Sequence, residues 1–183
     1  MLNLGCGLDA RVERVAPPAS ATWFDVDFPE VIAFRRGFFA ERPGLRRLAS
    51  PLEAPAWLAE VPDDRPAFVV ADGVLGYLAK EEVGRLVTRL LDRLPHGEIA
   101  FDVMSPYAVG RARSPEQRRV AAQLRGSVDE LASVDALSPR WRRTETRSVV
   151  RSRYVPLRYR LLLGLASLAP AARDAIRRLR YAF

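Results

Sequence analysis

The first eleven residues constrain the fold of this chain more than any other stretch. Leu2 and Leu4 are apolar, Gly5 and Gly7 follow them, and a helical pattern begins near Asp9. This order is typical of a buried strand that passes through a tight turn into a helix, and glycines in such a turn let the backbone approach a ligand closely. The start of the helix presents free N–H groups. We therefore expect a nucleotide-like cofactor at this turn, at the edge of a parallel sheet.

The spacing of the glycines narrows the choice of cofactor. The dinucleotide-binding fingerprint requires a third glycine at the position where this chain has Ala10. The absence of that glycine disfavours NAD. A Gly-x-Gly turn followed by an acidic residue favours S-adenosylmethionine, which we expect to lie against Gly5 and Gly7.

The first half of the chain alternates between apolar runs and runs with helical periodicity. We expect strands over residues 2–4, 21–27, 45–49, 67–71 and 98–103, and helices over residues 9–15, 29–39 and 81–94, with a helical turn around Trp57. The run 67–71 is apolar throughout, as expected for a strand covered on both faces. The alternation predicts an α/β fold with a mostly parallel central sheet and helices on both faces.

The pattern is weaker beyond residue 105. We expect helices over residues 115–124, 128–137, 157–168 and 171–178, and strands over residues 144–154 and 180–183, the last of them at the edge of the sheet. No internal repeat and no low-complexity linker divides the chain. The sequence therefore predicts a single domain over residues 1–183, in which residues 1–105 bind the cofactor and residues 106–183 complete the sheet and the substrate side.

Charge is unevenly distributed along the chain. Residues 1–110 carry a formal net charge of −4, whereas residues 111–183 carry +11. Such an asymmetry indicates either an acidic partner, such as nucleic acid, a membrane surface or an anionic substrate, or simply a solvated arginine-rich surface. We favour the solvated surface because a charge run alone is a weak signal.

The sequence contains no membrane-spanning run and no pattern of paired cysteines. The longest apolar candidate, residues 161–169, is shorter than the roughly 18–20 residues that a bilayer requires. Because the first expected strand starts at Met1, we expect no secretory signal. The single cysteine excludes an internal disulfide and a cysteine-based zinc site. We therefore expect a cytoplasmic protein that does not enter a membrane.

Acidic residues follow the second expected strand, where a ribose would be bound. Asp25 and Asp27 lie about twenty residues after the glycine turn, the spacing of a ribose-binding acid. Because they are two residues apart on a strand, we expect both carboxylates on the same side. The alternative for Asp27 is a role as the N-cap of the following helix.

Four further residues near strand ends are candidates for cofactor contacts. Asp72 ends the strand 67–71 and can face the amino or sulfonium end of the cofactor, or it can form a turn with Gly73. Tyr77 can line the pocket or serve in packing. Asp9 and Arg11 can contact the cofactor, or they can be a helix cap and a surface cation.

The two residue types most often used as nucleophile or base are scarce. His96 is the only histidine and lies in a Pro-His-Gly turn away from the expected ligand end of the sheet. This placement argues against histidine catalysis and most zinc chemistry. We interpret Cys6, beside the glycines, as a small apolar filler.

Four segments together resemble one protein family. They are Leu-Asn-Leu-Gly-Cys-Gly-Leu-Asp-Ala-Arg at 2–11, Phe-Asp-Val-Asp-Phe-Pro-Glu-Val-Ile at 24–32, Ala-Asp-Gly-Val-Leu-Gly-Tyr-Leu at 71–78 and Gly-Glu-Ile-Ala-Phe-Asp at 97–102. In order and spacing they are similar to the family of leucine carboxyl methyltransferase and the tetracenomycin-type polyketide O-methyltransferases, through most of residues 1–105.

The resemblance implies a class I, Rossmann-like O-methyltransferase that depends on S-adenosylmethionine. By position it assigns cofactor contacts to six residues: Gly5 and Gly7 at the turn, Asp27 at the ribose, Ser50 and Leu52 on the adenine side, and Asp72 at the methionine part. Members of the family carry a helical region before the first strand, which supplies an arginine for the cofactor carboxylate and part of a lid. This sequence begins at the first strand, so we expect either a start site that lies further upstream or a truncated form.

We expect the methyl acceptor to be a small acidic or phenolic metabolite. A carboxylate is already ionised at neutral pH, so its methylation requires no catalytic base and we name no catalytic residue. Arg111 and Arg113 are candidates for attracting an anionic acceptor. One alternative is a non-catalytic remnant of the family. Another is a nucleic-acid methyltransferase or binder, which no interleaved aromatic and basic motif supports.

Overall fold

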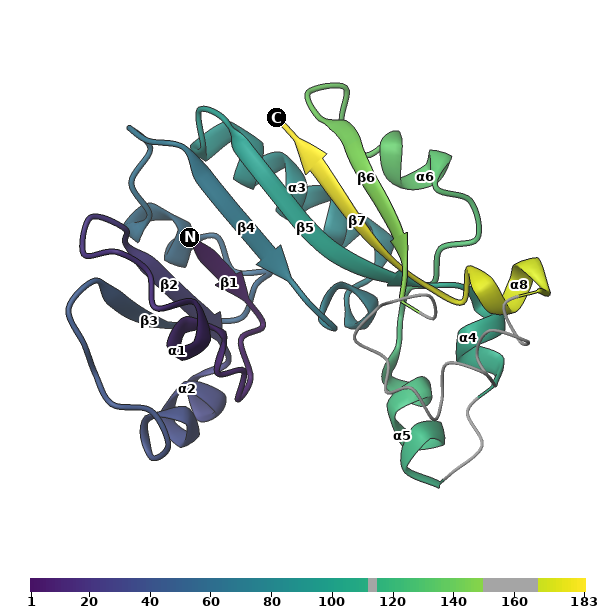
Figure 1. The fold of residues 1–183 in the computed structure, drawn as a ribbon, viewed down its shortest axis with the longest axis horizontal. Coiled ribbons are helices and arrows are strands. Elements are labelled where there is room, and N and C mark those ends of the chain that lie inside the picture. Colours follow the sequence, from purple (N-terminus) through teal and green to yellow (C-terminus); the bar gives the residue numbers. More distant parts are fainter. Residues whose placement is uncertain (112–114, 150–167) are drawn as a thin grey trace.

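The computed structural model describes residues 1–111, 115–149 and 168–183 and contains one mixed sheet (Figure 1). The sheet has seven strands in the order β3-β2-β1-β4-β5-β7-β6. The strands are β1 Leu2–Leu4, β2 Trp23–Asp27, β3 Leu45–Ala49, β4 Ala67–Ala71, β5 Gly97–Met104, β6 Arg142–Ser148 and β7 Ile176–Ala182. Strands β1 to β5 are parallel, and β7 is antiparallel to both of its neighbours. The predicted α/β fold with a mostly parallel sheet is confirmed.

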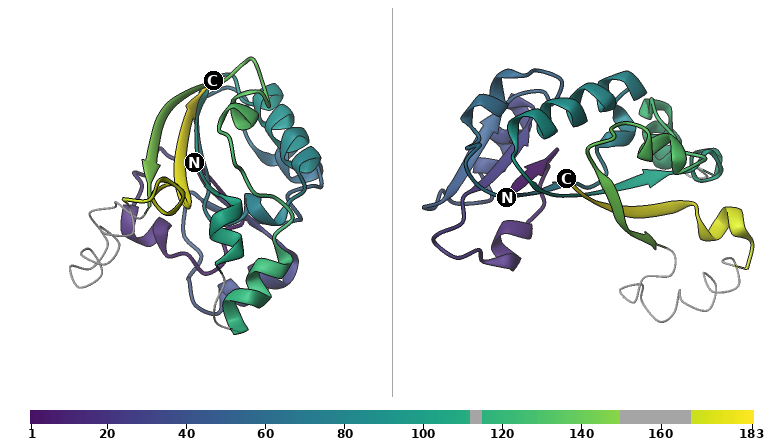
Figure 2. Two further views of the ribbon diagram at one scale, coloured as in Figure 1. Left: turned by 90° about the vertical axis from the view of Figure 1, so that its right-hand side faces the viewer. Right: turned by 90° about the horizontal axis from the view of Figure 1, so that it is seen from above.

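Helices lie on both faces of the sheet (Figure 2). One face carries α1 Arg11–Val15 and α2 Pro29–Arg36, and the other carries α3 Lys80–Arg93, α6 Ala132–Asp135 and the short 3₁₀ helix η1 Ala56–Glu60. The remaining helical segments are η2 Leu75–Tyr77, α4 Pro106–Gly110, α5 Pro115–Gln123 and α8 Pro170–Arg173.

The main core fills the space between the sheet and α3. That helix presents an apolar stripe at helical spacing, made of Leu86, Val87, Leu90 and Leu91, all of them buried. The same core reaches η1 through Trp57. A smaller cluster around Val12, Trp23 and Leu45 lies on the opposite face under α1.

The C-terminal strand corrects two predictions. Residues 176–178 belong to β7 and not to a helix over 171–178, because α8 ends at Arg173. The alternation of buried Leu179 and Tyr181 with Arg178 and Arg180 has the period of a strand. Nor does this strand form the edge of the sheet, since it pairs with both β5 and β6, which leaves β6 as the edge strand.

Other boundaries in the second half differ as well. The helix expected over 128–137 is only the four-residue α6, and the strand expected over 144–154 starts earlier, at Arg142, and ends at Ser148. The helix expected over 157–168 lies almost wholly outside the described residues, as does Arg113. Within the described ranges, no helix combines the length and the apolar character that a bilayer crossing requires.

Arginines of the positive second half pair with acids of the negative first half. Arg125 contacts Glu82 at 2.9 Å and Arg140 contacts Asp92 at 2.6 Å. Arg180 also forms an ion pair with Glu98. Part of the charge asymmetry is therefore balanced within the molecule.

Candidate functional site

The glycine turn after β1 has the backbone that its sequence predicts. Gly5 has φ 61° and Gly7 has φ 47°, both in the left-handed region. A Cβ on Gly5 would lie 2.5 Å from Cγ2 of Val74, whereas a Cβ on Gly7 would meet no atom within 4 Å. Gly5 is therefore required by the packing of the segment after β4, and Gly7 by its backbone angle alone.

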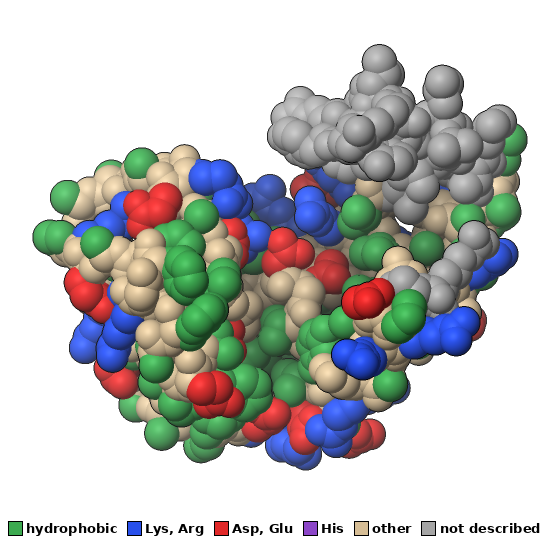
Figure 3. Space-filling view, turned by 90° about the horizontal axis from the view of Figure 1, so that it is seen from below, with side chains coloured by type: hydrophobic (Ala, Val, Ile, Leu, Met, Phe, Trp, Pro, Cys, Tyr) green, Lys and Arg blue, Asp and Glu red, His purple; other side chains and the backbone are tan. Residues whose placement is uncertain are grey.

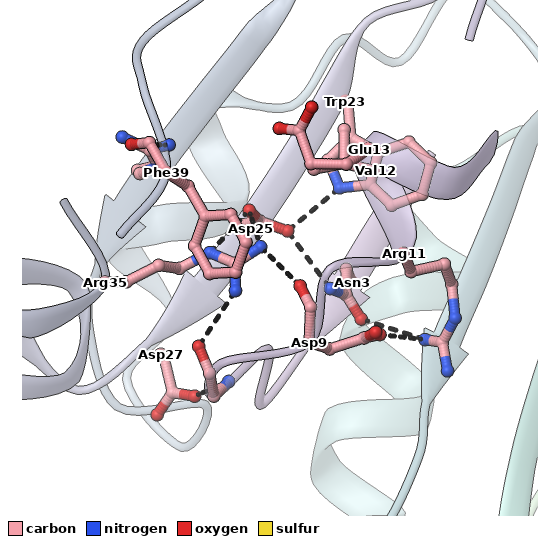
Figure 4. A network of polar contacts seen from close by, with 12 residues as sticks. Asn3, Asp9, Arg11, Val12, Glu13, Trp23, Asp25, Asp27, Arg35 and Phe39 are labelled. Carbon is pink, nitrogen blue, oxygen red and sulfur yellow. Dashed lines mark hydrogen bonds and ion pairs between the residues drawn. The ribbon is translucent and has the colours of Figure 1, made fainter. Parts of the chain in front are cut away.

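A buried arginine of α2 holds this turn in place (Figure 4). The Arg35 guanidinium donates to the carbonyl of Gly7 at 3.0 Å and to that of Asp9 at 2.7 Å. Its Nε and Nη2 also lie 3.0 and 2.9 Å from Oδ2 of Asp25. The role of Arg35 was not predicted from the sequence, although an arginine three positions after the apolar Ile32, on the same face of the expected helix, was the available signal.

Asp25 belongs to the interior and not to the ligand side of the turn. Its side chain is 0% exposed. Oδ1 accepts hydrogen bonds from Asn3 at 3.0 Å and from the Trp23 indole at 2.9 Å, and Oδ2 faces Arg35. The protein encloses both oxygens, so the structure gives no support to the prediction that Asp25 shares ribose binding with Asp27.

Asp27 is turned toward the glycine turn. Its Oδ2 accepts from the Gly7 N–H at 2.8 Å, and its Oδ1 accepts from the Phe28 N–H at 2.8 Å. The N-cap of α2 is Phe28, without a side-chain cap, so the alternative of Asp27 as N-cap is wrong. Each carboxylate oxygen can still accept a further hydrogen bond.

A cavity of about 290 Å³ opens beside Asp27 at the ends of β1, β2 and β3; we call it the Gly5 cavity. It brings together five of the ten predicted contact residues, which are Gly5, Asp27, Ser50, Leu52 and Tyr77. Phe28, Glu53 and Gly73 also line it. The carboxyl ends of the strands thus border a cavity, at the place where an open parallel sheet is expected to bind a ligand.

Glu53 carries an unsatisfied acceptor at this cavity. Its Oε2 is buried and has no hydrogen-bond partner among the described residues. A buried carboxylate oxygen without a partner is costly, so a donor from a water molecule or a ligand would stabilise this position. Glu53 was not among the predicted contacts, because the resemblance assigns the adenine side only to Ser50 and Leu52 of the segment after β3.

Three other predicted residues form an ion cluster on the far side of the turn, here called the Arg11 cluster. The Arg11 guanidinium lies 2.8 Å from Asp72 and 3.1 Å from Asp9, and it donates to Asn3 at 3.3 Å. The N-cap of α1 is Ala10, so Asp9 is not the cap. Side-chain exposures of 21% for Arg11 and 43% for Asp72 leave this pair accessible.

The residue after Asp72 is held by an acid that the sequence analysis did not single out. Asp102 of β5 accepts a hydrogen bond from the N–H of Gly73, whose φ is 71°. Burial raises the pKa of Asp102, and the nearby charge of Asp72 acts in the same direction. In Figure 3, acidic and basic side chains gather in a hollow of the molecular surface.

Neither Cys6 nor His96 offers a reactive side chain at the site. Burial raises the pKa of the Cys6 thiol to about 12, which keeps it protonated and unreactive. His96 is exposed in the turn before β5, at the opposite ends of the strands. Both placements agree with the sequence interpretation.

The comparisons with known sequences point to one family. Residues 1–91 match the family model of leucine carboxyl methyltransferase. The whole chain aligns at 32% identity with the tetracenomycin polyketide synthesis O-methyltransferase TcmP of Streptomyces glaucescens and covers 69% of it. A shorter alignment, 56% of the chain at 34% identity, covers 38% of the S-adenosyl-L-methionine-dependent methyltransferase dpfgK of Gibberella zeae, so the chain spans well under half of that relative.

Solved structures share the fold at low sequence identity. An S-adenosylmethionine-dependent methyltransferase from Mesorhizobium loti matches with a TM-score of 0.66 at 15% identity, covering 99% of this chain and 88% of that one. The N-methyltransferase NodS of Bradyrhizobium japonicum, in complex with S-adenosyl-L-homocysteine, matches with a TM-score of 0.59 at 15% identity, over 99% of this chain and 76% of that one. The architecture is that of class I methyltransferases. The chain belongs to the family of S-adenosylmethionine-dependent methyltransferases that includes leucine carboxyl methyltransferase and the tetracenomycin polyketide O-methyltransferase.

Proposed function

We propose that this protein transfers a methyl group from S-adenosylmethionine to a carboxylate or hydroxyl oxygen of a small, acidic, polyketide-like metabolite. The observation that carries the proposal is the Gly5 cavity, which is lined by Asp27 and by Glu53, whose buried Oε2 has no hydrogen-bond partner among the described residues. The similarity to TcmP supports an oxygen acceptor.

The Gly5 cavity fits the adenosine part of the cofactor. Asp27 is oriented by two backbone N–H groups and keeps acceptor capacity for two ribose hydroxyls. Oε2 of Glu53 can accept from the exocyclic amino group of adenine, which would satisfy this buried oxygen. Phe28 and Leu52 supply apolar walls for the base.

The Arg11 cluster fits the amino-acid end of the same cofactor. A zwitterion carries one carboxylate and one ammonium group, and the Arg11–Asp72 pair offers the complementary charges 2.8 Å apart. We assign the cofactor carboxylate to Arg11 and the ammonium group to Asp72, with Asp9 orienting the guanidinium. Charge-assisted hydrogen bonds of this kind are stronger than neutral ones.

When bound, S-adenosylmethionine supplies a methyl group on a positively charged sulfur, an electrophile that needs no further activation. A carboxylate acceptor is ionised at neutral pH, so the chain needs no general base to methylate it. The contribution of the residues is therefore to bind, to orient and to exclude water. A reaction without a general base agrees with the protonated, buried Cys6 and with the position of His96 at the opposite ends of the strands.

Isothermal titration with S-adenosylmethionine tests the cofactor site. We expect the unaltered protein to bind, and Asp27→Asn and Glu53→Gln each to weaken binding about tenfold or more, as expected for loss of a charge-assisted hydrogen bond. Asp64→Asn is the matched control, because Asp64 is exposed and pairs with its neighbour Arg65, away from the cavity. No binding by a folded sample at millimolar cofactor would refute the assignment. Incubation with methyl-labelled cofactor and a panel of aromatic acids and phenols then tests the transfer.

A further inference from the structure

A second cavity, of about 450 Å³, extends along the sheet face that carries α1. We call it the β4 groove. Its floor contains Phe68 and Val70 of β4 and Ala100 of β5, its wall includes Arg11 of α1, and Arg178 of β7 lies on the opposite side. Volumes of this order hold drug-sized molecules.

The apolar floor follows from the alternation of β4. Val69 and Ala71 belong to the main core on the α3 side, whereas Phe68 and Val70 line the groove. A strand that is apolar on both faces requires cover on both. Among the described elements, the helices on this face lie beside β1 to β3, and none crosses β4 and β5 (Figure 2).

The rim of the groove carries a cation, Arg178, that forms no ion pair within the described residues, although its charge acts on the nearby Asp102 carboxylate and opposes the rise of its pKa. Arg178 is exposed and lies opposite Asp102 in the register of β5 and β7. The carboxylate of Asp102 accepts from the Gly73 N–H, and no ion pair joins Arg178 to any described residue. Of the other charged groups at this end, Arg11 and Asp72 pair with each other. Arg178 can therefore pair with an incoming anion.

The groove adjoins the proposed cofactor site, because Arg11 and Asp72, assigned above to the amino-acid end of the cofactor, both line it. Asp72 lines the β4 groove, and the next residue, Gly73, lines the Gly5 cavity. Arg178 also lies toward this end, because its β5 partner Asp102 bonds to Gly73. A molecule held in the groove with its anionic group at Arg178 thus lies next to the amino-acid end of the cofactor site.

We propose that the β4 groove binds the methyl acceptor, and that this acceptor is a flat, largely apolar molecule with one anionic group paired to Arg178. This proposal names the substrate class of the function proposed above. It depends on that function only in calling the bound molecule the methyl acceptor. The binding site itself rests on the apolar floor, the unpaired guanidinium and the shared Asp72–Gly73 junction.

Titration with 2-naphthoate and its neutral amide, 2-naphthamide, tests the groove in the full chain. We expect Arg178→Gln to weaken naphthoate binding about tenfold, the loss expected for one charge-assisted hydrogen bond, and to leave naphthamide binding unchanged. Ala100→Phe fills the floor and should abolish binding of both compounds. Arg36→Gln on α2 is the control and should bind both compounds as the unaltered protein does.

Each outcome of these titrations bears on the groove. Failure of the unaltered protein to bind naphthoate, or equal naphthoate affinity in the Arg178→Gln variant, overturns the proposal. If Ala100→Phe does not fold, the exposed Arg178→Gln decides alone. A parallel titration with S-adenosylmethionine separates the two proposals: binding of naphthoate without binding of the cofactor refutes the proposed function, whereas the reverse refutes only the acceptor site.

Discussion

Two arginine–aspartate pairs lie on either side of the glycine turn, and they have similar distances but very different solvent exposure. Arg35 and Asp25 are both 0% exposed and lie 2.9 Å apart. Arg11 and Asp72 lie 2.8 Å apart with side-chain exposures of 21% and 43%. Distance alone therefore does not separate a structural pair from a ligand-binding pair.

The partners of each pair explain the difference. In the buried pair, both side chains form their other hydrogen bonds with protein groups. Arg35 donates to the carbonyls of Gly7 and Asp9. Asp25 accepts from the side chains of Asn3 and Trp23. The accessible pair contacts mainly other charged side chains and opens onto the β4 groove. The first pair shapes the turn, and the second is free to exchange partners when a zwitterion arrives.

The largest effect is expected when the buried pair is broken. Asp25→Ala leaves the Arg35 guanidinium buried without its counter-charge, which should cost about 3–5 kcal/mol of unfolding free energy. The matched variant Asp72→Ala should cost roughly 0.5 kcal/mol, because a solvent-exposed pair contributes little. Urea denaturation measures both. Equal losses in the two variants would contradict the division into a structural and an accessible pair.

The glycine turn held by Arg35 should respond next most strongly. Gly5→Ala places a Cβ 2.5 Å from Val74 at a φ of 61°, so overpacking and backbone strain together should cost about 2–3 kcal/mol. Gly7→Ala meets no neighbouring atom and should cost about 1 kcal/mol from backbone strain alone. Thermal unfolding of the two variants measures both losses of stability. A larger loss for Gly7→Ala than for Gly5→Ala would contradict this prediction.

A smaller effect on stability, but a clear effect on binding, is expected at the accessible pair. Arg11→Gln should change unfolding free energy by roughly 0.5 kcal/mol and should weaken S-adenosylmethionine binding about tenfold by removing the cation for its carboxylate. Arg14→Gln is the control, because Arg14 also contacts Asp9 but is 64% exposed and does not reach Asp72. Equal cofactor affinity in the two variants would remove Arg11 from the site.

The sequence predicted the parallel half of the molecule well because its signals are local. The apolar run of β4, the stripe of α3 and the paired glycines each report on their own segment. By contrast, the burial of Asp25 depends on Arg35, ten residues away, and on Asn3 in another strand, so no local pattern distinguishes it from Asp27. Strand β7 was missed in part for the same kind of reason, since its helix-like composition is overridden by pairing with β5 and β6.

The smallest expected effect concerns Asp102, whose carboxylate links the accessible pair to β5 through Gly73. Because its pKa in the folded protein is raised by burial, the folded state holds this proton more tightly than the unfolded state. The stability that the proton contributes is present in full below the unfolded pKa and is lost as pH rises through the folded pKa. Asp102→Asn keeps an oxygen for the Gly73 N–H but cannot ionise, so it should gain stability relative to the unaltered protein between about pH 3, which lies below the unfolded pKa, and about pH 7. Urea denaturation at the two pH values measures this change, and a variant that instead loses relative stability as pH rises would show that the ionised carboxylate is the form that holds Gly73.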